Sequence, residues 1–524
     1  MSDIPTPEDQ LAQAQSDHRA GRLDAAIEGY RQLLRDFPDN AELHANMGAA
    51  LKANGDTVAA ETSLRRSLAL DDGSLASHYN LANLLRQSER FDEALGHYHQ
   101  AQDLASDNVQ VLNNLGATLY DLNEIEAAIA VYRQALDHDP YDAEVLNNLG
   151  NALQRLGRLG EAEQQLRAAV AAAPDDATLR LNLGGALQVQ GRYDEAMTSY
   201  DDALALNPGH VKTRLKRGTL MALRGDWTNG FAEYMWRWKD ASDAPRPPLS
   251  GLKRWDGGRL DGDGILLWSE QGYGDAIHLC RYAPLLVARG GRPVLAVPQA
   301  LMPVMRVLSG VDVVANPAQA RTPLSFEASL MDLPHLFGST PDDLPNEVPY
   351  LAAEDAAVKR WSRRLAPSTA GPRIGIVWAG NPAQPHDYTR SIDYALFREL
   401  FDITGVDFVS LQVGADEVAR ARLVEDGVDD LSPDLADFGE TAAAMSALDL
   451  VISVDSAPAH LAGALGRSVW ILLSFDPDCR WLLSRRESPW YPSARLFRQP
   501  SPGDWRGVMH SLREALPQFV ETLR

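Results

Sequence analysis

Three short segments in the second half of the chain carry side chains that could do chemistry. The first runs from Glu270 to Asp275 and sets a carboxylate behind two glycines, Gly272 and Gly274. Glycine lets a backbone turn sharply and approach a ligand closely. The Asp275 carboxylate could accept the proton of a hydroxyl group as that group attacks an electrophilic carbon. The competing interpretation is that Asp275 only caps the helix that follows it.

The second segment contains Asn381, Arg390 and Ser391 and follows an apolar run at 373–378. An arginine fork can stabilise the negative charge that builds up on a departing phosphate. We therefore consider Arg390 as a phosphate ligand. The competing interpretation is an ordinary surface arginine.

The third segment reads DLVISVDSAPAHLAGALG and covers residues 449–466. We expect a strand to end at Asp455, Ser456 to cap the next helix, and His460 to lie one turn further along it. A helix N-terminus presents free N–H groups and the positive end of a dipole, so it is a natural phosphate site. The competing interpretation is a histidine that is simply packed or solvated.

Short apolar runs that alternate with helical stretches must position these segments. One set, GILLWSE, PVLAVP and VDVV, lies between residues 264 and 314, and a second, RIGIVWAG, VDFVSLQ, DLVISVD and VWILLS, lies between 373 and 474. Such alternation predicts two Rossmann-like lobes, each a parallel sheet with helices on both faces. We place the lobes at 251–368 and 369–524, after a proline-bearing linker at 241–250. Ligands in such folds bind beyond the carboxyl ends of the strands, where all three segments lie.

The first half of the chain repeats itself every 34 residues from about residue 7 to 210, and a degenerate unit follows to about residue 240. In each unit a small residue lets two helices approach, a larger one fills the gap, and a proline commonly ends the second helix. The helix pairs should stack into a superhelix whose concave face accepts peptides, with the last unit as a cap. The recurring residues are Ala26, Ala60, Ala94, Ala128, Ala162 and Ala196, then Tyr30, Leu64, Tyr98, Tyr132, Leu166 and Tyr200, then Gly48, Gly116, Gly150 and Gly184, and finally Pro38, Pro140, Pro174 and Pro208.

Asparagine occupies the sixth position of every repeat from the second to the sixth. A side-chain amide both donates and accepts hydrogen bonds, so a row of amides could hold a peptide backbone without reading its side chains. The competing interpretation is that these amides support hydrogen bonds between the helices. The residues are Asn46, Asn80, Asn114, Asn148 and Asn182.

Composition narrows the class of protein. The chain has 49 basic and 72 acidic residues, and a formal charge of -23 repels phosphate backbones and anionic membranes. Its two cysteines, Cys280 and Cys479, support neither a disulfide framework nor a thiolate metal cluster. The N-terminal residues lack the pattern of a signal peptide, and no stretch reaches about 18 consecutive apolar residues. We therefore expect a soluble cytoplasmic protein that binds neither nucleic acid nor membranes stably.

The two halves of the chain resemble two known families. The repeats resemble the tetratricopeptide repeat at nearly every signature position. The second half resembles the heptosyltransferase-like glycosyltransferases of the GT-B fold, through Gly274 and Asp275 before an apolar helix and through the spacing from Asp455 to His460. Ala457 replaces the glycine often found in that motif. The combination resembles O-linked N-acetylglucosamine transferase in architecture, and it resembles the cytoplasmic flagellin glycosyltransferases of bacteria.

This resemblance implies roles for the singled-out residues. Asp275 would be the general base of an inverting, metal-independent transfer to a Ser or Thr hydroxyl of a protein acceptor, flagellin in the nearest systems, which the asparagines of the repeats would hold. The donor would be a nucleotide-sugar, such as CMP-pseudaminic acid or a related nonulosonic acid. A final helix from about Arg506 would cross back to the first lobe. The donor-binding residues would be Gly272, Gly274, Asn381, Arg390, Ser391, Asp455, Ser456 and His460.

Two other functions stay open at this point. The α/β half could be inactive, which would leave a repeat-based scaffold or export chaperone. The chain could also glycosylate a lipid-linked saccharide, although its acidic balance is unfavourable for docking on an anionic membrane. No cofactor is expected beyond the nucleotide-sugar substrate, and acidic pairs such as Asp71 and Asp72 lack the spacing of metal ligands.

Overall fold

The structure is a computed structural model that describes residues 6–240, 242–366, 371–384 and 387–523. Residue 241, where we begin the linker, and residues 368 and 369, where we divide the lobes, lie outside the described residues. The chain forms two compact units, Met1–Ala186 and Leu187–Arg524. The division between these units falls inside the sixth repeat.

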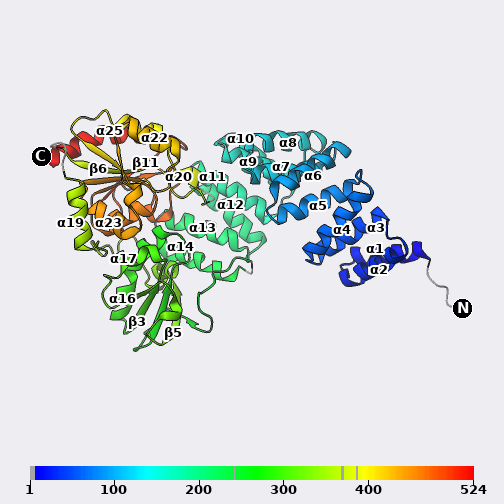
Figure 1. The fold of residues 1–524 in the computed structure, drawn as a ribbon, viewed down its shortest axis with the longest axis horizontal. Helices are drawn as coiled ribbons and strands as arrows, with labels where there is room; N and C mark the ends of the chain where they lie inside the picture. Colours follow the sequence, from blue (N-terminus) through cyan, green and yellow to red (C-terminus); the bar gives the residue numbers. More distant parts are fainter. Residues whose placement is uncertain (1–5, 241, 367–370, 385–386, 524) are drawn as a thin grey trace. The chain divides into compact units, whose positions relative to one another are not determined.

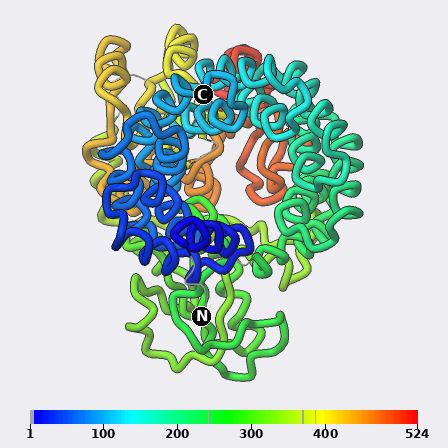
Figure 2. The backbone as a smooth tube through the Cα atoms, turned by 90° about the vertical axis from the view of Figure 1, so that its right-hand side faces the viewer, coloured from blue at the N-terminus to red at the C-terminus, as the bar shows by residue number. Residues whose placement is uncertain are grey.

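Helix pairs build the first unit, and each pair repeats the same local signals (Figures 1 and 2). The side chains of Asn40, Ser74, Asn108 and Asp142 each accept a backbone hydrogen bond from the residue three positions on, which caps the first helix of a repeat. These first helices begin 34 residues apart. The helices are α1 (Pro7–Arg19), α2 (Leu23–Asp36), α3 (Ala41–Ala53), α4 (Thr57–Leu70), α5 (Leu75–Gln87), α6 (Phe91–Leu104), α7 (Val109–Asp121), α8 (Ile125–His138), α9 (Ala143–Arg155), α10 (Leu159–Ala172) and α11 (Ala177–Val189).

The turn inside each helix pair holds one residue in the left-handed region of backbone space. Gly21, Gly55 and Gly157 take this place with φ of 73°, 82° and 73°. Glycine does so without strain because it has no Cβ. Glu89 and Asn123 hold the same place in the third and fourth repeats, with φ of 58° and 65°. The fold therefore keeps the turn even where the sequence lacks the glycine.

Small residues bring the two helices of a pair into contact, as the repeat pattern predicts. A Cβ added at Gly116 would lie 2.6 Å from Cε1 of Tyr132, and one at Gly150 would lie 2.6 Å from Cγ of Leu166. Tyr132 and Leu166 are both buried. The larger side chain thus occupies the space that the glycine leaves, and the predicted tetratricopeptide-repeat fold is confirmed.

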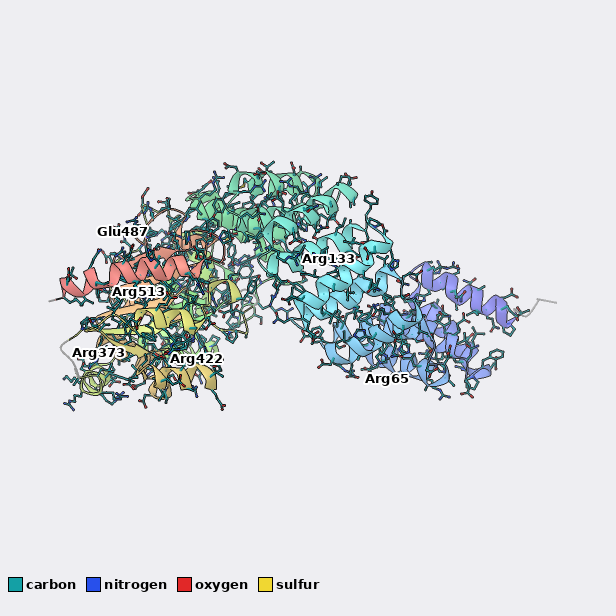
Figure 3. The ribbon with its side chains drawn as sticks, turned by 90° about the horizontal axis from the view of Figure 1, so that it is seen from above. Arg65, Arg133, Arg373, Arg422, Glu487 and Arg513 are labelled. Atoms are coloured by element: carbon teal, nitrogen blue, oxygen red, sulfur yellow. The ribbon has the colours of Figure 1, made fainter. Side chains whose placement is uncertain are left out.

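Ion pairs join neighbouring repeats at the surface of the first unit. Arg65 pairs with Glu93 at 3.0 Å, and Arg133 pairs with Glu161 at 3.3 Å. The two arginines are labelled in Figure 3. All four side chains are substantially exposed. Exposed pairs are screened by water and salt, so these contacts add little to stability and leave the buried alanine and leucine seams as the main source of cohesion.

The last repeats belong to the second unit because aromatic and polar side chains tie them to the α/β region. Trp227 stacks on Trp490, with ring centroids 5.1 Å apart and ring planes 17° from parallel. The side-chain amide of Gln188 donates to both carboxylate oxygens of Asp476, at 3.2 and 3.0 Å. The elements of this part are α12 (Tyr193–Leu206), α13 (Val211–Leu223), α14 (Trp227–Tyr234) and the 3-10 helix η1 (Met235–Lys239).

The first lobe is built on a five-stranded parallel sheet in the order β1-β5-β2-β3-β4. All five residues of β2 are buried, which fits a central parallel strand covered on both faces. The strands are β1 (Lys253–Arg254), β2 (Gly264–Trp268), β3 (Arg292–Ala296), β4 (Asp312–Val314) and β5 (Leu324–Ser329). The helices are α15 (Tyr273–Leu279), α16 (Ala283–Ala288), α17 (Met302–Met305) and α18 (Leu333–Leu336).

The second lobe is built on a six-stranded parallel sheet in the order β11-β10-β9-β6-β7-β8. The two parallel sheets confirm the predicted α/β class. The strands are β6 (Arg373–Val377), β7 (Asp407–Ser410), β8 (Asp429–Asp430), β9 (Leu450–Val454), β10 (Val469–Leu473) and β11 (Ala494–Arg498). The helix α19 (Asp355–Arg364) precedes the first of these strands and packs against α23. The other helices are α20 (Asp387–Arg390), α21 (Tyr394–Phe397), α22 (Glu417–Glu425), α23 (Phe438–Ser446), α24 (Ala457–Ala464) and α25 (Trp505–Thr522).

The final helix α25 packs inside the second lobe, so the expectation that it crosses back to the first lobe is wrong. Its residues Val508, Met509 and Leu512 are fully buried. They share one apolar core with Trp470 and Phe408 of the same lobe. The apolar face of α25 is therefore used up against its own sheet.

Candidate functional site

The first and third chemical segments meet where the two lobes touch. Helix α15 begins just after β2 and α24 begins just after β9, and these two helices pack against each other. The contact is close, because a Cβ added at Gly274 would lie 3.0 Å from Cδ2 of His460. The carboxyl ends of two different sheets thus bring Asp275 and the segment from Asp455 to His460 into one site.

Arg480 stands at the centre of this site. Its Nη2 donates to Oδ1 of Asp275 at 2.7 Å, and its Nε donates to Oδ1 of Asp478 at 2.8 Å. Its Nη1 lies 3.2 Å from Nε2 of His460. The side chains of Arg480 and Asp275 are only 15% and 18% exposed. An arginine of the second lobe therefore holds the carboxylate that we predict to be the base on the first lobe.

Sequence reasoning missed Arg480. The residue follows β10, which is a buried strand of the second sheet, and so it lies at the same carboxyl edge as the predicted segments. An arginine just beyond a buried parallel strand was the available signal. The N-cap of α15 is Gly272, which has no side chain that could cap the helix. The Asp275 carboxylate accepts a hydrogen bond from Arg480.

A chain of hydrogen bonds runs from Arg480 into the protein core. The Tyr491 hydroxyl lies 2.9 Å from Nδ1 of His460 and 2.9 Å from Nδ1 of His278. Burial and the Arg480 charge lower the pKa of His460 well below its usual range, so its ring is neutral at pH 7. A neutral ring has one donor and one acceptor nitrogen. Because arginine only donates, Nε2 of His460 is the acceptor, and its Nδ1–H donates to the Tyr491 hydroxyl. The same hydroxyl is hydrogen-bonded to Nδ1 of His278.

Both ring nitrogens of His460 therefore have partners inside the protein. The ring also stacks on Trp481, with centroids 5.4 Å apart and planes 17° from parallel. His460 is 2% exposed. In this arrangement it orients Arg480 and has no free N–H to offer a ligand.

Asp455 ends β9 beside this group. One carboxylate oxygen accepts from Nε1 of Trp481 at 2.8 Å, and the other lies 3.7 Å from Nε2 of His460. Burial raises the pKa of Asp455 to about 6, against the opposing effect of the Arg480 charge. The carboxyl group therefore changes charge just below neutral pH inside the site.

Ser456 is the N-cap of α24, as predicted, but its side chain does not cap the helix. Its hydroxyl donates to the carbonyl of Val454 at 3.2 Å. The expected side-chain cap is wrong at this position because the hydroxyl turns back towards the strand.

The second segment forms a clamp around Asp387. Arg390 Nε donates to Oδ1 of Asp387 at 2.9 Å, and the Ser391 hydroxyl donates to Oδ2 at 2.6 Å. The backbone N–H of Gly380 in turn donates to the Ser391 hydroxyl. Asn381 is exposed and accepts a hydrogen bond from the Ala383 N–H, which makes a local turn. Ser391 and Asn381 thus shape the loop.

Arg390 is nevertheless electrostatically part of the site. Its positive charge helps to lower the pKa of His460 and partly opposes the burial that raises the pKa of Asp455. The side chain is 31% exposed. Because β6 and β9 are neighbouring parallel strands, the loop after β6 that holds Arg390 lies at the same carboxyl edge as Asp455.

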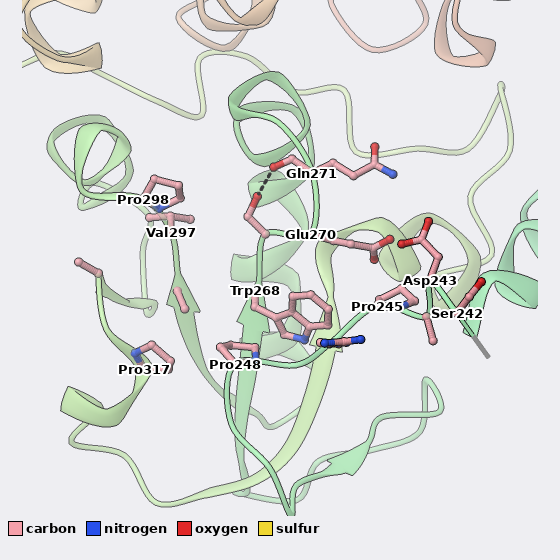
Figure 4. A pocket seen from close by; sticks show the side chains of 15 residues that line it. Ser242, Asp243, Pro245, Pro248, Trp268, Glu270, Gln271, Val297, Pro298 and Pro317 are labelled. Atoms are coloured by element: carbon pink, nitrogen blue, oxygen red, sulfur yellow. Dashed lines mark hydrogen bonds between the residues drawn. The ribbon is translucent and has the colours of Figure 1, made fainter. Parts of the chain in front are cut away.

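A cavity of about 850 Å³ opens at the carboxyl edge of the first sheet (Figure 4). Trp268 and Glu270 line it from the β2 side, and the segment from Ser242 to Arg246 lines it from the other. Glu270 is fixed by Arg237 of η1 at 2.9 Å and by the Ser329 hydroxyl at 2.6 Å. The cavity lies next to the loop that leads to Asp275. It is also bounded by the segment that connects the repeats to the first lobe.

The row of asparagines makes hydrogen bonds between successive repeats. Asn148 Nδ2 donates to Oδ1 of Asn113 at 2.9 Å, and Asn182 Nδ2 donates to Oδ1 of Asn147 at 2.7 Å. Asn114 donates to the Tyr79 hydroxyl in the same way. These contacts match the interpretation in which the amides support inter-helix hydrogen bonds.

The first two asparagines of the row differ from the others. Asn80 accepts from the ammonium group of Lys52 at 3.2 Å. Asn46 Nδ2 is buried and has no hydrogen-bond partner among the residues that the structure describes. Spare donor capacity is therefore found at the N-terminal end of the row.

The described residues contain neither a candidate membrane span nor a candidate metal cluster. No helix there is long and apolar enough to span a membrane. No group of three or more His, Cys, Asp or Glu side chains there could hold a metal ion. Burial raises the pKa of the Cys280 thiol to about 12, so this cysteine is not a thiolate at neutral pH.

Each half of the chain contains segments that match known protein families. Residues 147–211, 14–55, 118–157 and 77–108 match tetratricopeptide-repeat families. Residues 394–472 match glycosyltransferase family 9 (heptosyltransferase), and this match includes Asp455 and His460. The chain therefore carries tetratricopeptide repeats together with a glycosyltransferase family 9 domain, and this combination supports a glycosyltransferase.

A curated relative and several solved structures resemble parts of the chain. Protein FlbA of Caulobacter vibrioides is 29% identical over 316 residues, which cover 56% of this chain and 52% of that protein. The chain thus spans about half the length of this relative.

Two repeat structures illustrate the structural likeness. YrrB, a TPR protein with an unusual peptide-binding site, is 22% identical, covers 36% of this chain and 97% of its own, and has a TM-score of 0.31. PilF of Pseudomonas aeruginosa is 20% identical, covers 38% of this chain and 92% of its own, and has a TM-score of 0.34. Because these scores are low, the repeat assignment rests on the 34-residue period and the helix pairs.

Proposed function

We propose that this protein is an inverting, metal-independent O-glycosyltransferase that moves a sugar from a nucleotide-sugar to a Ser or Thr hydroxyl of a protein held by the repeats. One observation carries the proposal. Asp275 of the first lobe and His460, at the end of the Asp455-to-His460 segment of the second lobe, contact the two terminal nitrogens of the same arginine, Arg480. A base for the acceptor and a phosphate-binding edge for the donor are thus adjacent.

The reaction assigned to this site has a simple balance. The Ser or Thr hydroxyl gives its proton to the Asp275 carboxylate while its oxygen bonds to the anomeric carbon. The bond from that carbon to the phosphate oxygen breaks, and the electron pair stays on the phosphate. Arg390 and the N-terminus of α24 would stabilise that charge. No redox partner is needed.

The acceptor side of the proposal is supported by the cavity beside Glu270. Its lining includes residues of the segment that follows the repeats, so an acceptor chain held by the repeats could extend into it. Its volume is in the range of typical ligand pockets. We assign the acceptor Ser or Thr to the end of this cavity nearest Gln271.

Flagellin is the acceptor that we propose, with a CMP-activated nonulosonic acid such as CMP-pseudaminic acid as donor and the cytoplasm as the compartment. The support is the resemblance of the combined repeats and α/β lobes to flagellin glycosyltransferases. The acidic balance of the chain also disfavours the alternative of a lipid-linked acceptor on an anionic membrane.

The test is the intact mass of flagellin from the source organism with and without the gene for this protein. A loss of whole sugar units on deletion is the expected result, and the mass difference identifies the sugar. Return of the gene as Asp275→Asn should leave the lower mass. If Asp275→Asn restores the full mass, the base assignment is wrong. If deletion changes nothing while the repeats still bind flagellin, the scaffold interpretation is correct.

A further inference from the structure

We propose that Arg480 is a ligand of the donor phosphate and that Asp275 occupies its Nη2 until the donor binds, so that the phosphate replaces Asp275 on Arg480 and frees the Asp275 carboxylate for the acceptor. This inference rests on the proposed function and deepens it. It assigns to the pair a means of ordering the two substrates.

The charges around Arg480 support a replaceable partner. The guanidinium makes hydrogen bonds to two carboxylates, Asp275 and Asp478, at 2.7 and 2.8 Å. Asp478 lies two residues away on the same loop, so that contact moves with Arg480. Asp275 belongs to the other lobe and is the partner that a bound phosphate can replace.

The surrounding contacts fix where Arg480 points. Its Nη1 faces the neutral Nε2 of His460, and His460 is locked by Trp481 and Tyr491. A neutral acceptor orients the guanidinium without neutralising it. The planar fork can therefore keep its bond to His460 while Nη2 exchanges a carboxylate oxygen for a phosphate oxygen.

The pairing has a cost for the base. Asp275 Oδ1 already accepts a strong charge-assisted hydrogen bond from Arg480. In that state Oδ1 is shared with an Arg480 N–H. The phosphodiester of a CMP-linked donor carries one negative charge, as the carboxylate does, and presents two oxygens to the guanidinium fork, so it can replace Asp275 on the same N–H. Once it does, Asp275 can accept the hydroxyl proton, and the site becomes competent only when it is loaded with donor.

The chain offers a matched control pair. Arg485 and Asp342 also form an ion pair between the second and the first lobe, at 3.6 Å, but their side chains are 45% and 92% exposed. The same substitutions can be made in both pairs. An effect that comes only from the loss of an ion pair between the lobes will then appear in the variants of both pairs.

The experiment measures binding of CMP, CDP, UDP, GDP and ADP to the full chain by calorimetry, first to find the nucleotide that binds. Arg480→Gln should raise its Kd about 10- to 100-fold, because a charged hydrogen bond is lost. Arg480→Lys should lie between that variant and the parent chain, which keeps the test decisive if Arg480→Gln does not fold. Asp275→Asn should lower the Kd about fivefold, since a competing charge is removed.

The double variant separates competition from general repulsion. If Asp275 acts through Arg480, then Asp275→Asn should have no effect on Kd in the Arg480→Gln background. The controls Arg485→Gln and Asp342→Asn should leave Kd unchanged. This pattern supports the proposal.

Other outcomes overturn it in distinguishable ways. If Arg480→Gln weakens binding and Asp275→Asn does not change it, the reserve role of Asp275 is wrong. If neither Arg480→Gln nor Arg480→Lys changes Kd although the parent chain binds a nucleotide, Arg480 is not a phosphate ligand and the proposed function still stands. If none of the nucleotides binds the parent chain, the inference and the proposed function both fall.

Discussion

The two lobes contribute to the candidate site in opposite ways. In the second lobe, His460 of α24 and the residues Trp481 and Tyr491 after β10 are buried and linked to one another by ring contacts and hydrogen bonds. In the loop of the first lobe, Gly272 and Tyr273 are exposed, and Asp275 reaches its partner only across the lobe boundary. A prebuilt half suits a donor of constant shape, whereas an open half suits a protein segment that arrives already held elsewhere.

The largest effect should come from the open half. Replacement of Asp275 by Asn keeps the size of the side chain and removes its basicity, so the transfer rate should fall about 10²- to 10⁴-fold. Sugar incorporation into the acceptor, followed by mass spectrometry under single-turnover conditions, measures this. Asp342→Asn on the same lobe is the control and should transfer at the parent rate. An equal loss in both variants would mean that the chemistry lies elsewhere.

The prebuilt half should make the unfolding free energy of the protein depend on pH. Asp455 has a folded-state pKa of about 6, raised from 3.8 by burial. The folded state therefore holds this proton more tightly than the unfolded state, and the stabilising effect present at low pH is lost as pH rises through 6. The total is about 3 kcal/mol. About half of it should be lost between pH 5 and 7.5.

Asp455→Asn removes that titration. The stability of this variant relative to the parent chain should rise by about 1.5 kcal/mol between pH 5 and 7.5. Urea unfolding of both proteins at the two pH values gives the difference directly. A constant difference across this range would show that the carboxyl group does not change its charge there.

Tyr491→Phe should have a smaller effect, confined to the prebuilt half. The hydroxyl is the shared partner of His278 and His460, and both rings are buried. Its loss leaves ring nitrogens without partners and should cost about 1–3 kcal/mol of unfolding free energy. Denaturant titration measures the cost. Tyr273→Phe, which alters an exposed hydroxyl on the open half, should cost much less.

The sequence predicts the architecture well because helix pairs and buried strands each produce a pattern among neighbouring residues. The 34-residue period fixes the helix pairs, and the buried runs at β2, β6 and β9 fix which loops share an edge. Each of these signals needs only neighbouring residues and the geometry of helices and strands.

The hydrogen bonds of the site join residues that are far apart in the sequence, and sequence reasoning did not predict them. Asp275 and Arg480 are 205 residues apart and belong to different lobes. Tyr491 joins two histidines from different lobes through one hydroxyl. Such contacts depend on how two lobes are packed, which no single motif encodes. The capping role expected of the Ser456 side chain failed for a related reason, since its hydroxyl had a competing partner in Val454.

The stacking of Trp227 on Trp490 limits how such a protein can diversify. Repeats before Leu187 form a separate compact unit, so whole 34-residue modules could be gained, lost or exchanged there during evolution without disturbing the α/β lobes. The repeats that follow Leu187 share buried aromatic surface with those lobes and should be inherited with them. Acceptor recognition and sugar chemistry would then evolve at different rates within one gene. Chimeras that keep the whole sixth repeat and everything after it, from Ala177 onward, should retain the catalytic half while changing its client.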